Sequence, residues 1–148
     1  MSELFKIVLT SSLTVLGGIL VFVVGRIIEK FAIEPIHKQS RLIGEIADSL
    51  IFYADLYSNP GIGKREQMDE AKKVLREQAS QLIARNNMIP CYKFWRCLSL
   101  GHLPKRTDVI EARHELIGLS NSIHQGDGYV NAKRRKEIEK RLGIKTDI

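Results

Sequence analysis

The chain contains 148 residues, 44% of them hydrophobic, and it carries a formal net charge of +6. This length leaves room for one membrane span and one soluble domain of roughly 110 to 120 residues, which is large enough to bury a core without disulfides or metal ions. The first 25 residues contribute only Glu3 and Lys6, so the excess positive charge lies on the rest of the chain and indicates either an anionic partner or a bias that serves solubility and membrane orientation.

The first predicted element is an apolar helix. Residues 7–25 contain no charged side chain, and apolar residues continue past Arg26 to Ile28. At about 1.5 Å per residue, a helix of this length reaches roughly 28 to 33 Å, the thickness of the hydrocarbon core of a bilayer. A cleaved signal peptide is the alternative, but an A-x-A-like cleavage site is missing and the apolar stretch runs directly into a helical pattern. We therefore predict a transmembrane anchor helix over residues 1–30 and a cytosolic basic helical domain over residues 31–148.

Positive charges flank the apolar helix unequally. Lys6 alone precedes it, whereas Arg26, Lys30, Lys38 and Arg41 follow it closely. Because positively charged flanks stay in the cytoplasm, we expect a single-pass protein with its N-terminus outside and its C-terminal domain in the cytoplasm.

The apolar helix also carries small residues in register, since Ser11, Gly18 and Gly25 are spaced by seven. Such residues let membrane helices approach closely and form hydrogen bonds between helices, and a lone anchor has no need of them. The pattern predicts a homo-oligomer with hydroxyl groups lining the outer half of a pore, although glycine is also generally common in membrane helices. The packing or pore-lining candidates are Thr10, Ser11, Thr14, Gly18 and Gly25.

The remaining sequence shows helical periodicity throughout and no convincing strand alternation. Pro35 predicts a kink or break below the membrane. Helices are expected over residues 26–58, about 64–87 and 91–100, from about 108 with Asp108 and Glu111 as a capping box, and over about 131–142 with a stop at Gly143. We predict an all-α fold in which one N-terminal transmembrane helix precedes a cytosolic bundle of about five helices.

Cys91 and Cys97 are the two cysteines of the chain, and they lie six residues apart on one expected helix. They then point to different faces, which excludes a local disulfide or a shared metal ion. We expect buried free thiols in a reducing compartment, and the sequence indicates no cofactor.

The thirty residues from 78 to 107 contain no acidic side chain, and cations alternate there with aromatic residues. Sites for nucleotides or single-stranded nucleic acid use this combination, because cations bind phosphate and rings stack on bases. The alternative is that the aromatic residues belong to the core while the cations are solvated or lie against anionic lipid. The ligand-binding candidates are Arg85, Lys93, Trp95, Arg96, Lys105 and Arg106.

Two further patterns carry possible chemistry. Arg96 is followed by His102, and an arginine with a histidine four to six residues later is the signature of HEPN-type ribonucleases, in which histidine acts as acid or base and arginine holds phosphate. The match is short, and Gly101 interrupts the helix before the histidine. Glu111 and His114 have the spacing of half a di-iron site, but a second copy is missing. We therefore expect no metal and no enzyme, with Arg96 and His102 as the fallback catalytic pair.

Two sequence blocks, residues 33–47 and 115–122, resemble a group of uncharacterised bacterial single-span membrane proteins. The overall plan is also similar to oligomeric membrane effectors of antiphage defence. One is the channel effector of the Hailong system, which is controlled by nucleic-acid oligomers, and the other is the HEPN-like membrane accessory of type VI CRISPR loci. The resemblance implies a homo-oligomeric pore in a bacterial inner membrane.

The leading hypothesis is a homo-oligomeric membrane effector or ion channel of a bacterial defence system, gated by a nucleotide or oligonucleotide at the cytosolic domain. Its partners are other copies of the chain and the lipid bilayer. The second hypothesis is a passive anchor or scaffold for a cytosolic protein partner. The third is a membrane-tethered HEPN-like ribonuclease.

Overall fold

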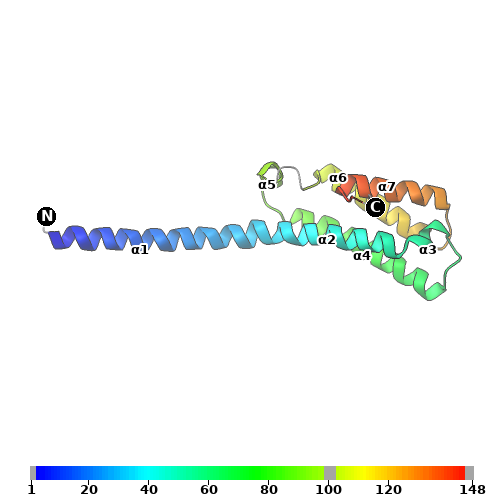
Figure 1. Cartoon of the computed structure of the whole chain (residues 1–148), viewed down its shortest axis with the longest axis horizontal. Helices are drawn as coiled ribbons and strands as arrows, with labels where there is room; N and C mark the ends of the chain where they lie inside the picture. Colours follow the sequence, from blue (N-terminus) through cyan, green and yellow to red (C-terminus); the bar gives the residue numbers. More distant parts are fainter. Residues whose placement is uncertain (1–2, 99–102, 146–148) are drawn as a thin grey trace.

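The computed structural model describes residues 3–98 and 103–145, and this part of the chain consists of helices and turns without a β-strand (Figure 1). The predicted all-α fold, an apolar N-terminal helix followed by a helical bundle, is confirmed. In chain order the elements are α1 (Glu3–Ile28), the π-helical turn η1 (Glu29–Ile33), α2 (Glu34–Phe52), α3 (Ala54–Ser58), α4 (Arg65–Asn87), α5 (Tyr92–Leu98), α6 (Arg106–Ser122) and α7 (Gly128–Leu142).

The first three elements form one continuous helix of 50 residues, Glu3–Phe52. Pro35 lies in the first turn of α2 and does not break it, so the predicted break is wrong, and the irregularity at this point is the π turn η1. Proline lacks an N–H group, and its ring collides with the carbonyl four residues earlier in a regular α-helix. The chain accommodates the ring with the wider π turn, in which the Glu34 N–H bonds to the carbonyl of Glu29, five residues back.

Helix α1 projects away from the bundle along its own axis, and none of its residues is buried (Figure 1). Of the helices in the described part of the chain, the one formed by α1 and its continuation is long and apolar enough to cross a membrane, by length and composition. The core helix of a soluble protein and an N-terminal signal sequence can have the same length and composition, but a core helix is mostly buried and α1 is not. Here the apolar stretch has no protein partner within the chain.

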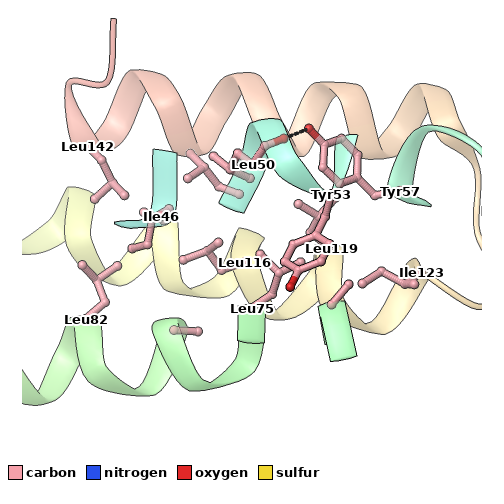
Figure 2. Close-up of a cluster of buried hydrophobic side chains, with 14 of the residues drawn as sticks. Ile46, Leu50, Tyr53, Tyr57, Leu75, Leu82, Leu116, Leu119, Ile123 and Leu142 are labelled. Atoms are coloured by element: carbon pink, nitrogen blue, oxygen red, sulfur yellow. Dashed lines mark hydrogen bonds between the residues drawn. The ribbon is translucent and has the colours of Figure 1, made fainter. Parts of the chain in front are cut away.

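The bundle consists mainly of α2, α4, α6 and α7 around a single core (Figure 2). Helices α2 and α4 run antiparallel, because Gln78 bonds to Ser49 near the end of α2 while Arg85 bonds to Lys38 near its start. Each fully buried leucine or isoleucine contributes roughly 1.5 to 3 kcal/mol through removal of apolar surface from water. Members with no or almost no exposed surface include Leu42, Ile46, Leu50, Leu75, Leu82, Leu116, Leu119, Ile123 and Ile138.

A buried polar network closes the end of the bundle farthest from α1. The Asn131 amide donates to the Tyr57 carbonyl at 2.8 Å and accepts from the Ser122 hydroxyl at 2.6 Å. The Tyr57 hydroxyl in turn donates to the carbonyl of Leu50 (Figure 2). Burial raises the pKa of Tyr57, so its phenol remains a hydrogen-bond donor. Gly128 fits beside this network because a Cβ there would collide with the Ser58 carbonyl oxygen.

The ends of α6 and α7 differ from the predicted ones. The capping box is wrong, since α6 begins at Arg106 and the Asp108 carboxylate lies inside its first turn, 3.1 Å from Arg141 of α7. Helix α7 starts three residues earlier than expected, because the Asp127 side chain accepts a bond from the Tyr129 N–H and caps the helix. The predicted stop at Gly143 is confirmed by its left-handed conformation, with φ of +70°.

Replacing Asn131 with alanine is expected to destabilise the bundle. The substitution leaves the Tyr57 carbonyl and the Ser122 hydroxyl without their shared partner, which costs about 2 to 3 kcal/mol. We expect the midpoint of thermal unfolding, followed by circular dichroism of the detergent-solubilised chain, to fall by roughly 5 to 10 °C. Asn87→Ala, at an exposed position at the end of α4, is the matched control and is expected to unfold like the natural protein. Equal midpoints for both variants would contradict a structural role for Asn131.

Candidate functional site

The acid-free segment folds around α5 at the end of the bundle from which α1 departs (Figure 1). A small hydrophobic cluster holds it there: Ile89, Tyr92 and Leu103 are buried, and Ile36 of α2 packs against them together with Trp95. This cluster is separate from the main core of the bundle. Helix α5 is therefore attached directly to the part of α2 that follows the π turn.

Two hydrogen bonds fasten α5 to the segment that precedes α6. The Tyr92 hydroxyl donates to the Pro104 carbonyl at 2.7 Å, and the Arg96 guanidinium donates to the Leu103 carbonyl at 3.2 Å. Burial raises the pKa of Tyr92, although Arg106 and Arg96 act in the opposite direction. The phenol is therefore protonated at neutral pH and available as the donor to Pro104.

The structure brings four of the six predicted ligand-binding residues together. They surround an open pocket of about 450 Å³, and a second pocket of about 450 Å³ adjoins it along the shared residues Tyr92, Lys93 and Arg106. The Arg106 guanidinium lies 5.2 Å from the centre of the Tyr92 ring, which forms a cation–π contact. We name the whole depression the basic groove; its lining residues are Cys91, Tyr92, Lys93, Phe94, Arg96, Lys105, Arg106 and Thr107.

The electrostatic character of the basic groove is one-sided. No carboxylate lines either pocket. Within residues 3–98 and 103–145, no carboxylate oxygen lies within 4 Å of the charged nitrogens of Lys93, Lys105 or Arg106. Arg135 and Arg141 of α7 differ, because Arg135 pairs with Glu139 at 2.7 Å and Arg141 pairs with Asp108 at 3.1 Å. The groove is thus a cationic surface that is open to an external anion.

Two of the predicted ligand-binding residues have other roles. Arg85 donates to the Lys38 carbonyl at 2.7 Å and to the Gln81 side chain at 2.8 Å, so it ties α4 to α2. Trp95 is half-buried against the cluster around Ile36 and makes an edge-to-face contact with Phe94 at 5.3 Å. Neither lines the basic groove. Its aromatic residues are Tyr92 and Phe94.

Thr107 lines the groove but is not among the residues predicted from the sequence. A threonine at the start of α6 carries no distinctive pattern, and only the packing of α5 against that helix places it beside Lys105 and Arg106. Tyr92 has no helical spacing that marks it as an anchor, because Ile89 lies outside the helices and Cys91 with φ of 45° separates the two residues; the fold alone brings their side chains into one cluster.

The cysteine prediction is partly wrong. Cys91 and Cys97 are free, as expected, but both are exposed. Helix α5 has only two turns and buries Tyr92 alone, so its other side chains have no core to enter. Cys91 precedes the helix with φ of 45°, and this left-handed conformation makes the tight turn from Pro90 into α5.

The fallback catalytic pair cannot be assembled from the described residues. His102 lies outside them, and the Arg96 guanidinium bonds to the Leu103 carbonyl. The possible di-iron half-site at Glu111 and His114 gains no further ligands. The described part of the chain contains no group of three or more His, Cys, Asp or Glu side chains that could hold a metal ion.

The small-residue face of α1 forms the second candidate site. The hydroxyls of Thr10 and Thr14 bond back to the carbonyls of Lys6 and Thr10, at 2.8 and 2.9 Å, so in the single chain they are satisfied within the helix. A Cβ added at Gly18 or Gly25 would meet nothing within 4 Å. No contact within the chain therefore requires glycine at these positions.

Comparison of the chain with protein-family models, with curated proteins and with solved structures finds no match. The candidate sites consequently rest on their own geometry and chemistry.

Arg85→Ala and Lys93→Ala are expected to differ in thermal stability, because Arg85 ties α4 to α2 whereas Lys93 lines the basic groove. Loss of the Arg85 bond to the Lys38 carbonyl costs about 1 to 2 kcal/mol and lowers the thermal unfolding midpoint by roughly 3 to 6 °C. Lys93 is exposed, so its truncation leaves the midpoint within about 1 °C. The measurement is differential scanning calorimetry in detergent, and a larger loss in Lys93→Ala would reverse these assignments.

Proposed function

We propose that this protein is a self-associating, single-span membrane effector, with the character of a homo-oligomeric channel, whose basic bundle lies in the cytoplasm and responds to an anionic ligand. The observation that supports it most directly is the continuity of the helix from α1 through η1 into α2. A passive anchor needs no rigid joint between its span and its domain. A protein that transmits a conformational change from its domain to its span needs such a rigid joint.

The coupling has a simple mechanical basis. Leu42, Ile46 and Leu50 fix α2 in the core of the bundle, and the backbone hydrogen bonds continue from α2 toward the span. Because a helix resists bending over a few turns, a rotation or shift of α2 within the bundle moves α1 with it. A ligand that favours one of two bundle packings thereby favours one arrangement of the spans.

Self-association is supported by helical glycines at positions where no contact within the single chain excludes a larger residue. Glycine within a helix costs roughly 0.5 to 1 kcal/mol relative to alanine. Gly17, Gly18 and Gly25 of α1, and Gly44 of α2, all have open space where a Cβ would lie. With one extra residue in the π turn, the step from Gly25 to Gly44 amounts to about five whole turns. These two glycines therefore share roughly one face, which extends the small-residue seam into the bundle.

The basic groove is the proposed ligand site. It combines four cations with the rings of Tyr92 and Phe94, and it lies beside Ile36, close to the joint between span and bundle. An anion bound there acts on α5, α6 and α2 together. Neutralising charge at this position is a direct way to alter how α5 packs on the long helix.

A passive scaffold is the second candidate, and one observation favours it. Large apolar side chains are exposed near the ends of α2 and α3 and at the start of α7, as a protein-binding surface would require. They are Ile51, Phe52, Ile62 and Tyr129. A catalytic role for Arg96 and His102 stays a prediction, as does a part in antiphage defence.

Gly18→Leu is expected to weaken self-association of the span. A leucine side chain on the small-residue face prevents close approach of two helices, which lowers the association constant by roughly tenfold or more. Leu16→Phe adds bulk on the opposite side of α1 and is the matched control. The measurement is the fraction of cross-linked oligomer, with dye leakage from proteoliposomes as the second readout. If Gly18→Leu matches the natural protein in both, the channel proposal is wrong.

Replacement of residues 3–28 by an unrelated transmembrane helix of equal length distinguishes the effector hypothesis from the scaffold hypothesis. A scaffold needs only attachment, so its cellular function is expected to survive the exchange. An effector whose span packs on other copies is expected to lose it. Expression level and membrane insertion of the chimaera, measured by carbonate extraction, serve as controls.

A further inference from the structure

Helix α5 exposes large apolar side chains next to the cations of the basic groove. Phe94 is 60% exposed and Leu98 is 63% exposed, although each lies on a helix with a buried anchor at Tyr92. Exposure of large apolar side chains to water is unfavourable, and exposed apolar clusters mark surfaces that bind a partner or a membrane. Lys93 and Lys105 are exposed beside them. The surface is therefore amphipathic, with apolar rings and positive charge side by side.

The position of α5 along the long helix is fixed by its contact with Ile36. Ile36 follows Ile28, the last residue of α1, by eight residues, which corresponds to about 12 Å along the axis. The headgroup layer on each side of a bilayer is about 5 to 8 Å thick. Between the two levels, Phe31 and Ile33 are exposed as well. Figure 1 shows α5 at the end of the bundle from which α1 departs, so with α1 in the hydrocarbon core, α5 would lie close to the headgroup layer.

We propose that α5 docks on the anionic surface of the bilayer that α1 crosses, with Phe94 and Leu98 entering the interface and Lys93, Lys105 and Arg106 binding lipid phosphates. The inference rests on the membrane insertion assumed in the proposed function, and it identifies the anionic partner of the basic groove as lipid headgroups. Interfacial segments have this composition, with large apolar side chains for the acyl boundary and cations for the phosphates.

Lipid fits the groove better than a nucleic acid does. Phe94 is the one exposed ring of the groove that a base could stack on, because Tyr92 is buried and Trp95 is half-buried against Ile36 and does not line the groove. Leu98 is 63% exposed among the described residues, and its apolar side chain contributes nothing to binding of a polyanion. A bilayer accounts for both the exposed apolar side chains and the unpaired charge of Lys93, Lys105 and Arg106.

Docking has a consequence for the coupling described above. The span and α5 become two attachments to the same membrane, joined through Ile36 and the π turn. Two attachments fix the orientation of the bundle about the axis of α1, whereas a span alone leaves it free to rotate. The charge of the leaflet thereby becomes a determinant of how neighbouring bundles face one another.

The test uses Trp95, the single tryptophan of the chain, as a built-in probe. The full-length protein is reconstituted in bilayers with or without phosphatidylglycerol, and its emission is quenched by lipids brominated at shallow or deep acyl positions. Docking predicts at least twofold stronger quenching by shallow-brominated lipid in phosphatidylglycerol bilayers than in purely zwitterionic ones. The difference is expected to shrink in high salt, because cation–headgroup attraction is screened.

Charge reversal provides the decisive comparison. Lys93→Glu with Lys105→Glu is expected to abolish the phosphatidylglycerol-dependent quenching, since each cation near an anionic surface is worth about fivefold in the docking equilibrium. Lys64→Glu with Arg65→Glu changes the net charge equally at the start of α4, at the other end of the bundle, and is expected to quench like the natural protein. Both pairs are exposed, so folding is preserved, which circular dichroism verifies.

Three results would overturn the inference. The first is equal quenching in anionic and zwitterionic bilayers, and the second is equal quenching in the two charge-reversal variants. The third is a response of Trp95 to soluble cyclic nucleotides or oligonucleotides in detergent without a response to phosphatidylglycerol, which would assign the groove to a soluble ligand. Cross-linking of the span and carbonate extraction, measured on the same samples, distinguish these failures from a failure of membrane insertion or self-association.

Discussion

The unbroken backbone hydrogen bonding from α1 through η1 into α2 is the constraint on which the rest of the structure depends. It converts two segments of opposite character, an apolar helix without protein partners and a core helix of the bundle, into one rigid body. Pro35 would ordinarily interrupt such a helix. The π turn keeps the backbone hydrogen bonding continuous, because in this one turn the bond spans five residues and not four. The orientation of every other element relative to α1 follows from this joint.

The two ends of the bundle are built from different interactions. At the end far from α1, Asn131 and Tyr57 form a buried polar network whose members are mutually satisfied, which gives that end a defined geometry. At the end near α1, the small cluster around Tyr92 and Ile36 holds α5 with few buried contacts. Helix α5, which carries part of the basic groove, is therefore held by fewer buried contacts than the helices of the main core, and it is the helix of the bundle most readily displaced.

Cations in different parts of the bundle also differ in whether they are paired with carboxylates. The cations of α7 are largely used inside the bundle, as Arg141 with Asp108 and Arg135 with Glu139 show. Lys93, Lys105 and Arg106 have no such carboxylate partner in the described part of the chain. The net charge of +6 does not show which cations are paired with carboxylates, and the structure does. These three cations lie on the side of the bundle from which the apolar helix departs.

The sequence by itself determined the all-α class, the apolar helix and most helix boundaries, because the period of apolar residues and the conformation of Gly143 are local properties. It also identified the acid-free segment, from which Lys93, Arg96, Lys105 and Arg106 do come together. Only the tertiary structure decided that Arg85 and Trp95 serve packing, that the cysteines are exposed and that Asp108 pairs with Arg141. These outcomes depend on which helix lies opposite, and contacts between residues distant in the chain leave no periodic trace in the sequence.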